Sequence, residues 1–159
     1  MTYQRWLALL GFIALVFLAG GIGGAATATS VGTWYPTLAK PSWNPPSWVF
    51  GPVWSMLYLL MAVAAWRVWR HVEHPGRRPA LAWFLGQLGL NALWSVLFFG
   101  LRSPGLAFAE VLVLWAAIAA TLVKFARIDR PAALLWLPYL AWVSFAAVLN
   151  GTVWWLNRQ

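Results

Sequence analysis

The chain has 159 residues, of which 62% are hydrophobic and only 9% are charged, and its mean hydropathy is +0.71. Soluble domains carry about 25% charged residues, so this composition cannot cover a water-facing surface and lipid is the expected solvent. The absence of cysteine excludes disulfides and thiolate metal sites. The net charge of +8 arises at the ends of apolar runs, which is typical of membrane proteins and not of nucleic-acid binding.

Charged residues divide the sequence into five apolar segments, each long enough to cross a bilayer. A helix of about 20 residues spans the ~30 Å hydrocarbon core, and backbone groups in lipid must be hydrogen-bonded within their own segment. We therefore predict an all-α fold, a single domain over residues 1–159 that forms an integral membrane bundle. The five predicted transmembrane helices cover residues 6–26, 47–66, 79–101, 103–123 and 131–156.

The basic residues are distributed unequally between the two sides of the predicted bundle. The side with the N-terminus, the second link and the fourth link carries Arg5, Arg67, Arg70, Arg77, Arg78, Lys124, Arg127 and Arg130. The other side carries only Lys40, Arg102 and Arg158. In a bacterial cell membrane, the positive-inside rule then predicts a cytoplasmic N-terminus, with the first loop and the C-terminus outside.

The first loop, residues 28–46, is the least helical stretch of the chain. Its prolines fix φ and remove backbone donors, so it continues neither neighbouring helix. We predict a lid that lies across the bundle with its aromatic side chains pointing down, and the alternative is an interfacial aromatic belt. The residues assigned to this lid are Trp34, Pro41, Trp43, Pro45 and Pro46.

A polar stripe runs along the third segment, where Gln87, Asn91 and Ser95 recur at helical spacing beside Trp94 and Phe98. Polar side chains in a span normally face the bundle interior or a cavity. Two interpretations stay open from the residues alone. The stripe either orients a ligand or supplies hydrogen bonds between helices.

Aromatic residues share faces on two other segments. Trp54 and Tyr58 lie four residues apart, and Trp142, Phe145 and Ala146 gather on the last segment. A stripe of this kind packs a core more often than it binds a ligand, and both interpretations are kept.

The sequence offers few titratable residues that could have a catalytic or metal-binding role. Glu110, about two turns into the fourth segment, is expected to snorkel or to hydrogen-bond near the outer interface, and the alternative is a functional carboxylate within the membrane. His71 and His74 are expected in a solvated link, with no metal site and no required cofactor.

Several of these motifs together resemble one family. Trp34-Tyr35, the run Lys40-Pro41-Ser42-Trp43-Asn44-Pro45-Pro46, and then Trp54 and Tyr58 resemble the translocator protein / tryptophan-rich sensory protein (TspO/MBR) family, as do Asn91 and the later run Pro138-Tyr139-Leu140-Ala141-Trp142. The resemblance covers essentially the whole chain. It implies a five-helix bundle, usually a homodimer, that binds tetrapyrroles and, in some members, sterols.

The resemblance also implies a ligand site. Positions that line the family's pocket are matched by Tyr35, Trp54, Asn91, Trp94, Ser95, Trp142 and Ala146. The full expected set adds Tyr58, Phe98 and Phe145. We therefore predict a membrane receptor or sensor with porphyrin, such as protoporphyrin IX or haem, as its ligand.

Two other functions remain as alternatives. One is a transporter of tetrapyrroles, lipids or sterols. The other is a light-dependent porphyrin-degrading enzyme that would use Trp54 and Trp142. The C-terminal sterol motif has Trp where Tyr is expected, which counts against sterol recognition. A homodimer is expected through Ala82 and Gly86, with Gly20 and Gly24 as the other candidate face.

Overall fold

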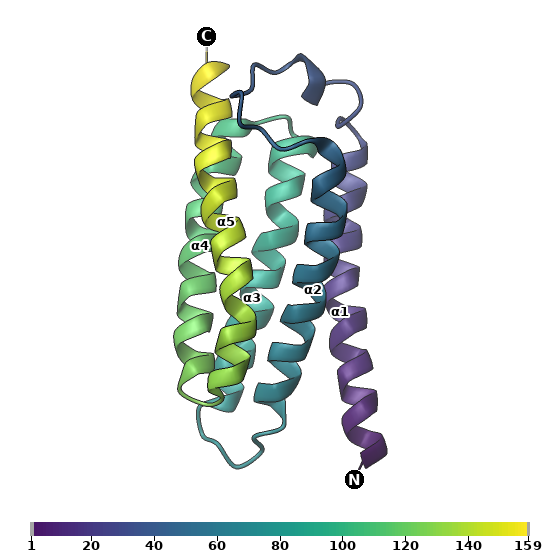
Figure 1. Cartoon of the computed structure of the whole chain (residues 1–159), viewed down its shortest axis with the longest axis vertical. Helices are drawn as coiled ribbons and strands as arrows, with labels where there is room; N and C mark the ends of the chain where they lie inside the picture. Colours follow the sequence, from purple (N-terminus) through teal and green to yellow (C-terminus); the bar gives the residue numbers. More distant parts are fainter. Residues whose placement is uncertain (1, 159) are drawn as a thin grey trace.

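The computed structural model describes residues 2–158, and every regular element in that range is helical. Figure 1 shows the long helices side by side, with the N- and C-termini at opposite ends of the bundle. Their bounds are α1 Thr2–Ala28, α2 Ser47–Trp69, α3 Arg77–Ser95, α4 Pro104–Ala126 and α5 Arg130–Leu156. Two short elements accompany them, a 3₁₀ turn η1 at Tyr35–Thr37 and a π-helical turn η2 at Val96–Gly100.

The helices form a closed ring in the order α1, α2, α5, α4 and α3, each packed against two neighbours. The loop between α1 and α2 crosses the end of the bundle at which the C-terminus lies (Figure 1). We call this end, with the helical turns beneath it, the loop-side half.

Several helices run further than the sequence predicted. α2 continues through Trp69 and α4 through Ala126, although the predictions stopped before Arg67 and Lys124. Both basic residues stay within a helix because their long side chains can carry the charge to the membrane surface. α1 likewise continues to Ala28, which shortens the loop to residues 29–46.

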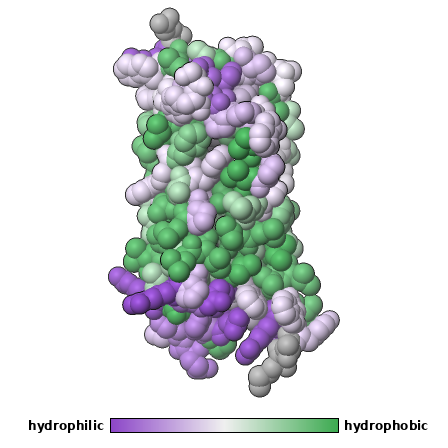
Figure 2. All heavy atoms as spheres, in the orientation of Figure 1, coloured by the Kyte–Doolittle hydropathy of each residue, from purple (hydrophilic) through white to green (hydrophobic). Residues whose placement is uncertain are grey.

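All five helices are long and apolar enough to cross a membrane. Their outward side chains include large exposed hydrophobic residues, among them Leu10, Leu18, Val113, Leu134 and Val148. Figure 2 shows this hydrophobic surface in green over the middle of the visible face, with hydrophilic residues gathered at the end near the N-terminus. Such a surface is stable in hydrocarbon and not in water, so the chain is an integral membrane protein.

The half of the bundle away from the loop is tightly packed. Met61, Ala64, Phe84 and Trp136 are fully buried there. The indole of Trp136 also donates a 3.1 Å hydrogen bond to the Ile118 carbonyl oxygen. We call this region the closed half, and it provides the rigid base above which the cavity lies.

Candidate functional site

A cavity of about 430 Å³ lies in the loop-side half, within the range typical of small-molecule sites. All five long helices contribute to its wall, and aromatic and aliphatic side chains predominate. The lining residues are Gly20, Gly23, Gly24, Thr27, Ala28, Val31, Tyr35, Ser47, Phe50, Gly51, Trp54, Tyr58, Asn91, Trp94, Ser95, Phe98, Phe99, Val111, Leu114, Trp142, Val143, Ala146, Leu149, Asn150 and Val153.

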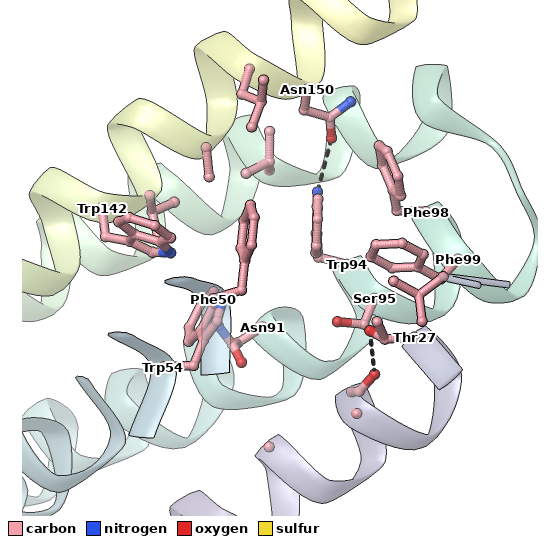
Figure 3. A pocket seen from close by; sticks show the side chains of 18 of the residues that line it. Thr27, Phe50, Trp54, Asn91, Trp94, Ser95, Phe98, Phe99, Trp142 and Asn150 are labelled. Atoms are coloured by element: carbon pink, nitrogen blue, oxygen red, sulfur yellow. Dashed lines mark hydrogen bonds between the residues drawn. The ribbon is translucent and has the colours of Figure 1, made fainter. Parts of the chain in front are cut away.

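Helices α2 and α5 present one aromatic wall. Trp54 lies 5.4 Å from Tyr58 between ring centroids, and Phe50 lies 5.9 Å from Trp142. Phe50, Trp54 and Tyr58 are spaced four residues apart, so one face of α2 carries all three rings. Figure 3 shows Trp54, Phe50 and Trp142 grouped together on one side of the cavity.

The end of α3 forms a second aromatic wall. Trp94 stacks on Phe98 at 5.1 Å and meets Phe99 edge-on at 6.1 Å. The π-helical turn η2 begins directly after Ser95, and such turns are frequent at functional sites. Phe98 and Phe99 both lie in this turn, and both line the cavity.

A few polar groups punctuate these walls. The Trp94 indole donates a 2.9 Å hydrogen bond to Asn150 Oδ1, drawn as a dashed line in Figure 3, and Asn150 Nδ2 donates to the Pro104 carbonyl oxygen. This chain of bonds connects α3, α5 and the start of α4. It holds the Trp94 ring upright against the cavity.

Asn91 belongs to a buried network that joins three helices. The Tyr58 hydroxyl donates to Asn91 Oδ1 at 2.8 Å, and Asn91 Nδ2 donates to the Tyr139 hydroxyl at 3.2 Å. Tyr139 in turn donates to Gln87 Oε1 at 2.8 Å. The residues of the polar stripe therefore have different roles. Gln87 makes hydrogen bonds within and between helices and does not line the cavity. Asn91 bonds across helices and also lines the cavity, and Ser95 lines the cavity as well.

The loop between α1 and α2 supplies two lining residues, Val31 and Tyr35. The Tyr35 hydroxyl donates to Asn44 Oδ1 at 3.1 Å, and burial raises the pKa of this phenol above its ordinary value despite that bond. Trp34 packs on Phe98 and Trp43 packs on Phe145, both outside the cavity. Pro41, Pro45 and Pro46 also lie outside the lining set. The loop crosses the end of the bundle beside the cavity (Figure 1), but none of the five predicted lid residues lines it.

Nine of the ten residues predicted to bind ligand line the cavity: Tyr35, Trp54, Tyr58, Asn91, Trp94, Ser95, Phe98, Trp142 and Ala146. Phe145 does not. On α5 it is rotated about 60° from Trp142, at 3.6 residues per turn, and packs against that ring at 5.6 Å. The structure thus brings the predicted set together with this one correction, and ligand contact itself stays a prediction.

Gly20 packs against α2 inside the bundle. A Cβ placed on Gly20 would lie 2.6 Å from the Tyr58 ring, so the close approach of α1 to α2 requires glycine there. This contact assigns Gly20 to packing within the monomer. Ala82 and Gly86 on α3 are exposed and free for the predicted dimer contact.

Glu110 corrects an expectation. The sequence predicted a carboxylate that snorkels or hydrogen-bonds near the interface, but Glu110 is only 9% exposed and its two carboxyl oxygens are buried without a hydrogen-bond partner among the described residues. Its position on the inward face of α4, one residue before the lining residue Val111, keeps it from reaching the headgroups.

A second polar cluster joins α2 to α5 at the opposite end of the bundle. Asp129 caps α5 by accepting from the Ala132 N–H, and it also bonds Arg67 Nε at 3.1 Å and His71 Nε2 at 3.0 Å. Burial by itself raises the pKa of Asp129, but these bonds outweigh it and hold the pKa below its ordinary value. The sequence analysis placed His71 in a solvated link and missed this contact. The described residues contain no cluster of three or more His, Cys, Asp or Glu able to hold a metal ion.

Comparison with known proteins gives the same assignment over nearly the whole chain. Residues 12–156 match the model of the TspO/MBR family. A tryptophan-rich protein TspO of Chlorobaculum tepidum is 42% identical over 91% of this chain and 92% of its own length. The translocator protein of Bos taurus is 36% identical, covering 96% of this chain and 92% of its own. A tryptophan-rich sensory protein of Cereibacter sphaeroides is 42% identical over 86% of this chain and 85% of its own length. The chain is therefore a member of the TspO/MBR family.

Proposed function

We propose that this protein is a membrane receptor or sensor that binds porphyrin-type tetrapyrroles in the loop-side cavity. The observation that carries the proposal is the wall itself. Two groups of rings, one with Trp54 and Trp142 and the other with Trp94 and Phe98, border a space bounded by all five helices. Rigid aromatic rings favour a flat aromatic guest, since stacked or edge-on ring pairs contribute about 0.5–1.5 kcal/mol each beyond burial.

The few polar groups of the wall suit the edge of such a guest. Asn91, Ser95 and Tyr35 are the side chains that would orient a ligand's polar atoms, as convergent polar groups do in apolar pockets. Neither required cofactor nor metal enters this proposal. Protoporphyrin IX is the probe of choice because it combines a flat macrocycle with a polar edge.

Titration of protoporphyrin IX into the purified protein, followed by tryptophan fluorescence, tests the proposal. Wild type is expected to show saturable quenching, and Trp142→Ala is expected to bind about tenfold more weakly, equivalent to about 1.4 kcal/mol. Trp48→Ala is the matched control, because Trp48 is 74% exposed and lies outside the lining set. Non-saturable quenching, or an equal loss in both variants, would contradict a site in the cavity.

A light-dependent degradation of the porphyrin is a second candidate, favoured by the presence of two oxidisable indoles, Trp54 and Trp142, in the same wall. Illuminated samples are expected to lose porphyrin absorbance more slowly in Trp54→Phe and Trp142→Phe than in wild type. Each variant is compared at equal occupancy of the site, so weaker binding is not mistaken for slower chemistry. Unchanged loss in both variants would remove this candidate and leave binding intact.

A further inference from the structure

The cavity has an open side, and the exposure of its wall residues locates that side. Among the described residues that line the cavity, the exposed ones are Gly24, Ala28, Val31, Ser47 and Gly51. The other lining residues are buried or half-buried. All five exposed residues belong to the end of α1, the residues just after it, and the start of α2. We call this opening between α1 and α2 the mouth.

The two helices contact each other firmly only below the mouth. Near the far end of the bundle, Trp6 stacks on Trp66 at 6.2 Å, and the Trp66 indole donates to the Arg5 carbonyl oxygen at 2.8 Å. Midway, Gly20 lies against the Tyr58 ring. Between Gly20 and the loop, α1 and α2 no longer lie this close together.

The glycines at the mouth show the separation directly. A Cβ placed on Gly24 or on Gly51 would meet no heavy atom within 4 Å. The same construction on Gly20, one turn below Gly24, meets the Tyr58 ring at 2.6 Å. The space between α1 and α2 therefore widens within a single turn of α1.

The mouth lies between two helices that are long and apolar enough to span a membrane. Gly24 is four residues from the end of α1, and Gly51 is four residues from the start of α2. At 1.5 Å per residue, both lie roughly 6 Å inside the membrane-spanning helices. The side chains around the mouth are small and nearly all apolar, which suits contact with acyl chains.

The loop above the cavity is fastened at several points. The Asn157 amide both accepts from the Ala39 N–H and donates to the Ala39 carbonyl oxygen, each at 2.9 Å. Ser30 donates to the Phe99 carbonyl oxygen at 2.7 Å, and Lys40 Nζ donates to the carbonyl oxygens of Tyr35 and Leu38. The first two contacts tie the loop to the residue after α5 and to η2, and the Lys40 bonds stabilise the loop itself.

We propose that the ligand enters the cavity laterally from the bilayer, through the mouth between α1 and α2, and not from water through the loop. This inference takes its ligand from the proposed function. The expected class is a membrane-dissolved amphiphile, with a flat apolar body among the acyl chains and a polar edge at the headgroups. Such a molecule is already oriented to slide edge-on between the two helices.

Bulky substitutions at the mouth test the route kinetically. Gly24→Phe combined with Gly51→Phe places two bulky side chains at the opening, where an added Cβ meets no heavy atom within 4 Å at either position. With protoporphyrin IX delivered from donor vesicles, the association and dissociation rates are both expected to fall about tenfold. A weaker affinity with an unchanged association rate would show that the rings fill the cavity and do not block its entrance, and it would contradict the route. The double control is Gly21→Phe with Gly89→Phe, both exposed, unobstructed and outside the lining set.

A second measurement needs no ligand and separates this inference from the proposed function. Because the chain lacks cysteine, Ala146→Cys introduces a single thiol on the cavity wall. A membrane-soluble maleimide is expected to label it, and labelling is expected to slow about tenfold when Gly24→Phe and Gly51→Phe are added. If wild type bound no porphyrin, the proposed function would fail while this assay would still decide the route.

The opposite route has its own variant. Asn157→Ala removes both bonds to Ala39 and loosens the loop. Lateral entry predicts unchanged porphyrin and maleimide rates in this variant. Faster rates in Asn157→Ala, together with no effect of the two phenylalanines at the mouth, would overturn the proposal in favour of entry through the loop.

Discussion

The closed half and the loop-side half of the bundle are built from the same helices, and both contain tryptophan at their centres. In the closed half, Trp136 is fully buried, with Phe84, Phe125 and Tyr139 around it at centroid distances of 5.1–6.0 Å. In the loop-side half, Trp54 and Trp142 are only half-buried, because part of each ring borders the cavity.

The difference lies in the residues around each indole. In the closed half, α2 contributes Ala62, Ala64 and Ala65, all fully buried, so neighbouring helices approach closely and large side chains fill the remaining space. In the loop-side half, α2 carries Phe50 and Trp54, which hold neighbours apart, and the glycines of α1 add no side chain to fill the gap. Composition along one helix thus decides where the bundle is solid and where it is hollow.

The largest expected effect comes from breaking the closed half. Trp136→Ala should destabilise the protein by about 3–5 kcal/mol, because it removes a buried indole and leaves a cavity. Thermal unfolding in detergent measures the loss. Trp142→Ala changes the half that already contains a cavity, so it should lower the free energy of unfolding clearly less than Trp136→Ala does. Equal losses would mean that the two halves do not differ in packing.

The boundary between the halves is tested by Tyr139→Phe. This change removes the hydroxyl that bonds Gln87 and Asn91, and it should destabilise the protein by about 1–2 kcal/mol. Tyr3→Phe serves as the control, since Tyr3 is 74% exposed. Because Asn91 also lines the cavity, porphyrin affinity should fall in Tyr139→Phe and not in Tyr3→Phe. An unchanged unfolding temperature would contradict a structural role for the network.

The smallest expected effect concerns the Asp129 cluster at the end of the closed half. The pKa of Asp129 is lowered in the folded state, so its contribution is complete above the unfolded pKa and is lost as pH falls through the folded value. Asp129→Asn keeps a capping side chain and removes the charge, and it should cost about 1 kcal/mol at pH 7 because both partners are partly exposed.

The pH dependence provides the control for that prediction. The difference in unfolding temperature between wild type and Asp129→Asn should shrink steadily as the pH is lowered below about 4. A difference that stays constant into acid would show that the charge of Asp129 contributes nothing.

Much of this fold follows from the sequence, because five apolar segments punctuated by charge leave few alternatives in lipid. The aromatic walls were also predictable in part, since Trp54 and Tyr58 repeat at helical spacing. Phe50 extends that same spacing and was missed although the signal was present. Asn150, a polar residue within a span, offered a second unused signal.

Other features depend on geometry that no local pattern encodes. Phe99 lines the cavity from a π turn that the sequence pattern did not predict, and Phe145 misses it through a modest rotation around α5. Glu110 is buried because other helices pack over it, which the local sequence of its own helix does not reveal. The cluster at Asp129 forms between residues about 60 positions apart in the sequence. No pattern around Arg67 or His71 predicts their contact with Asp129.

Paramagnetic broadening of alanine methyl signals by manganese protoporphyrin IX tests the central claim most directly. Ala146 lines the cavity of the loop-side half, and Ala132 is fully buried at the start of α5, about 15 Å along that helix from Trp142, its nearest lining residue. If the cavity holds the ligand, one equivalent should broaden the Ala146 methyl signal beyond detection and affect the Ala132 signal far less, because the broadening falls steeply with distance. Equal broadening of both signals, or a sharp Ala146 signal at saturation, would contradict it.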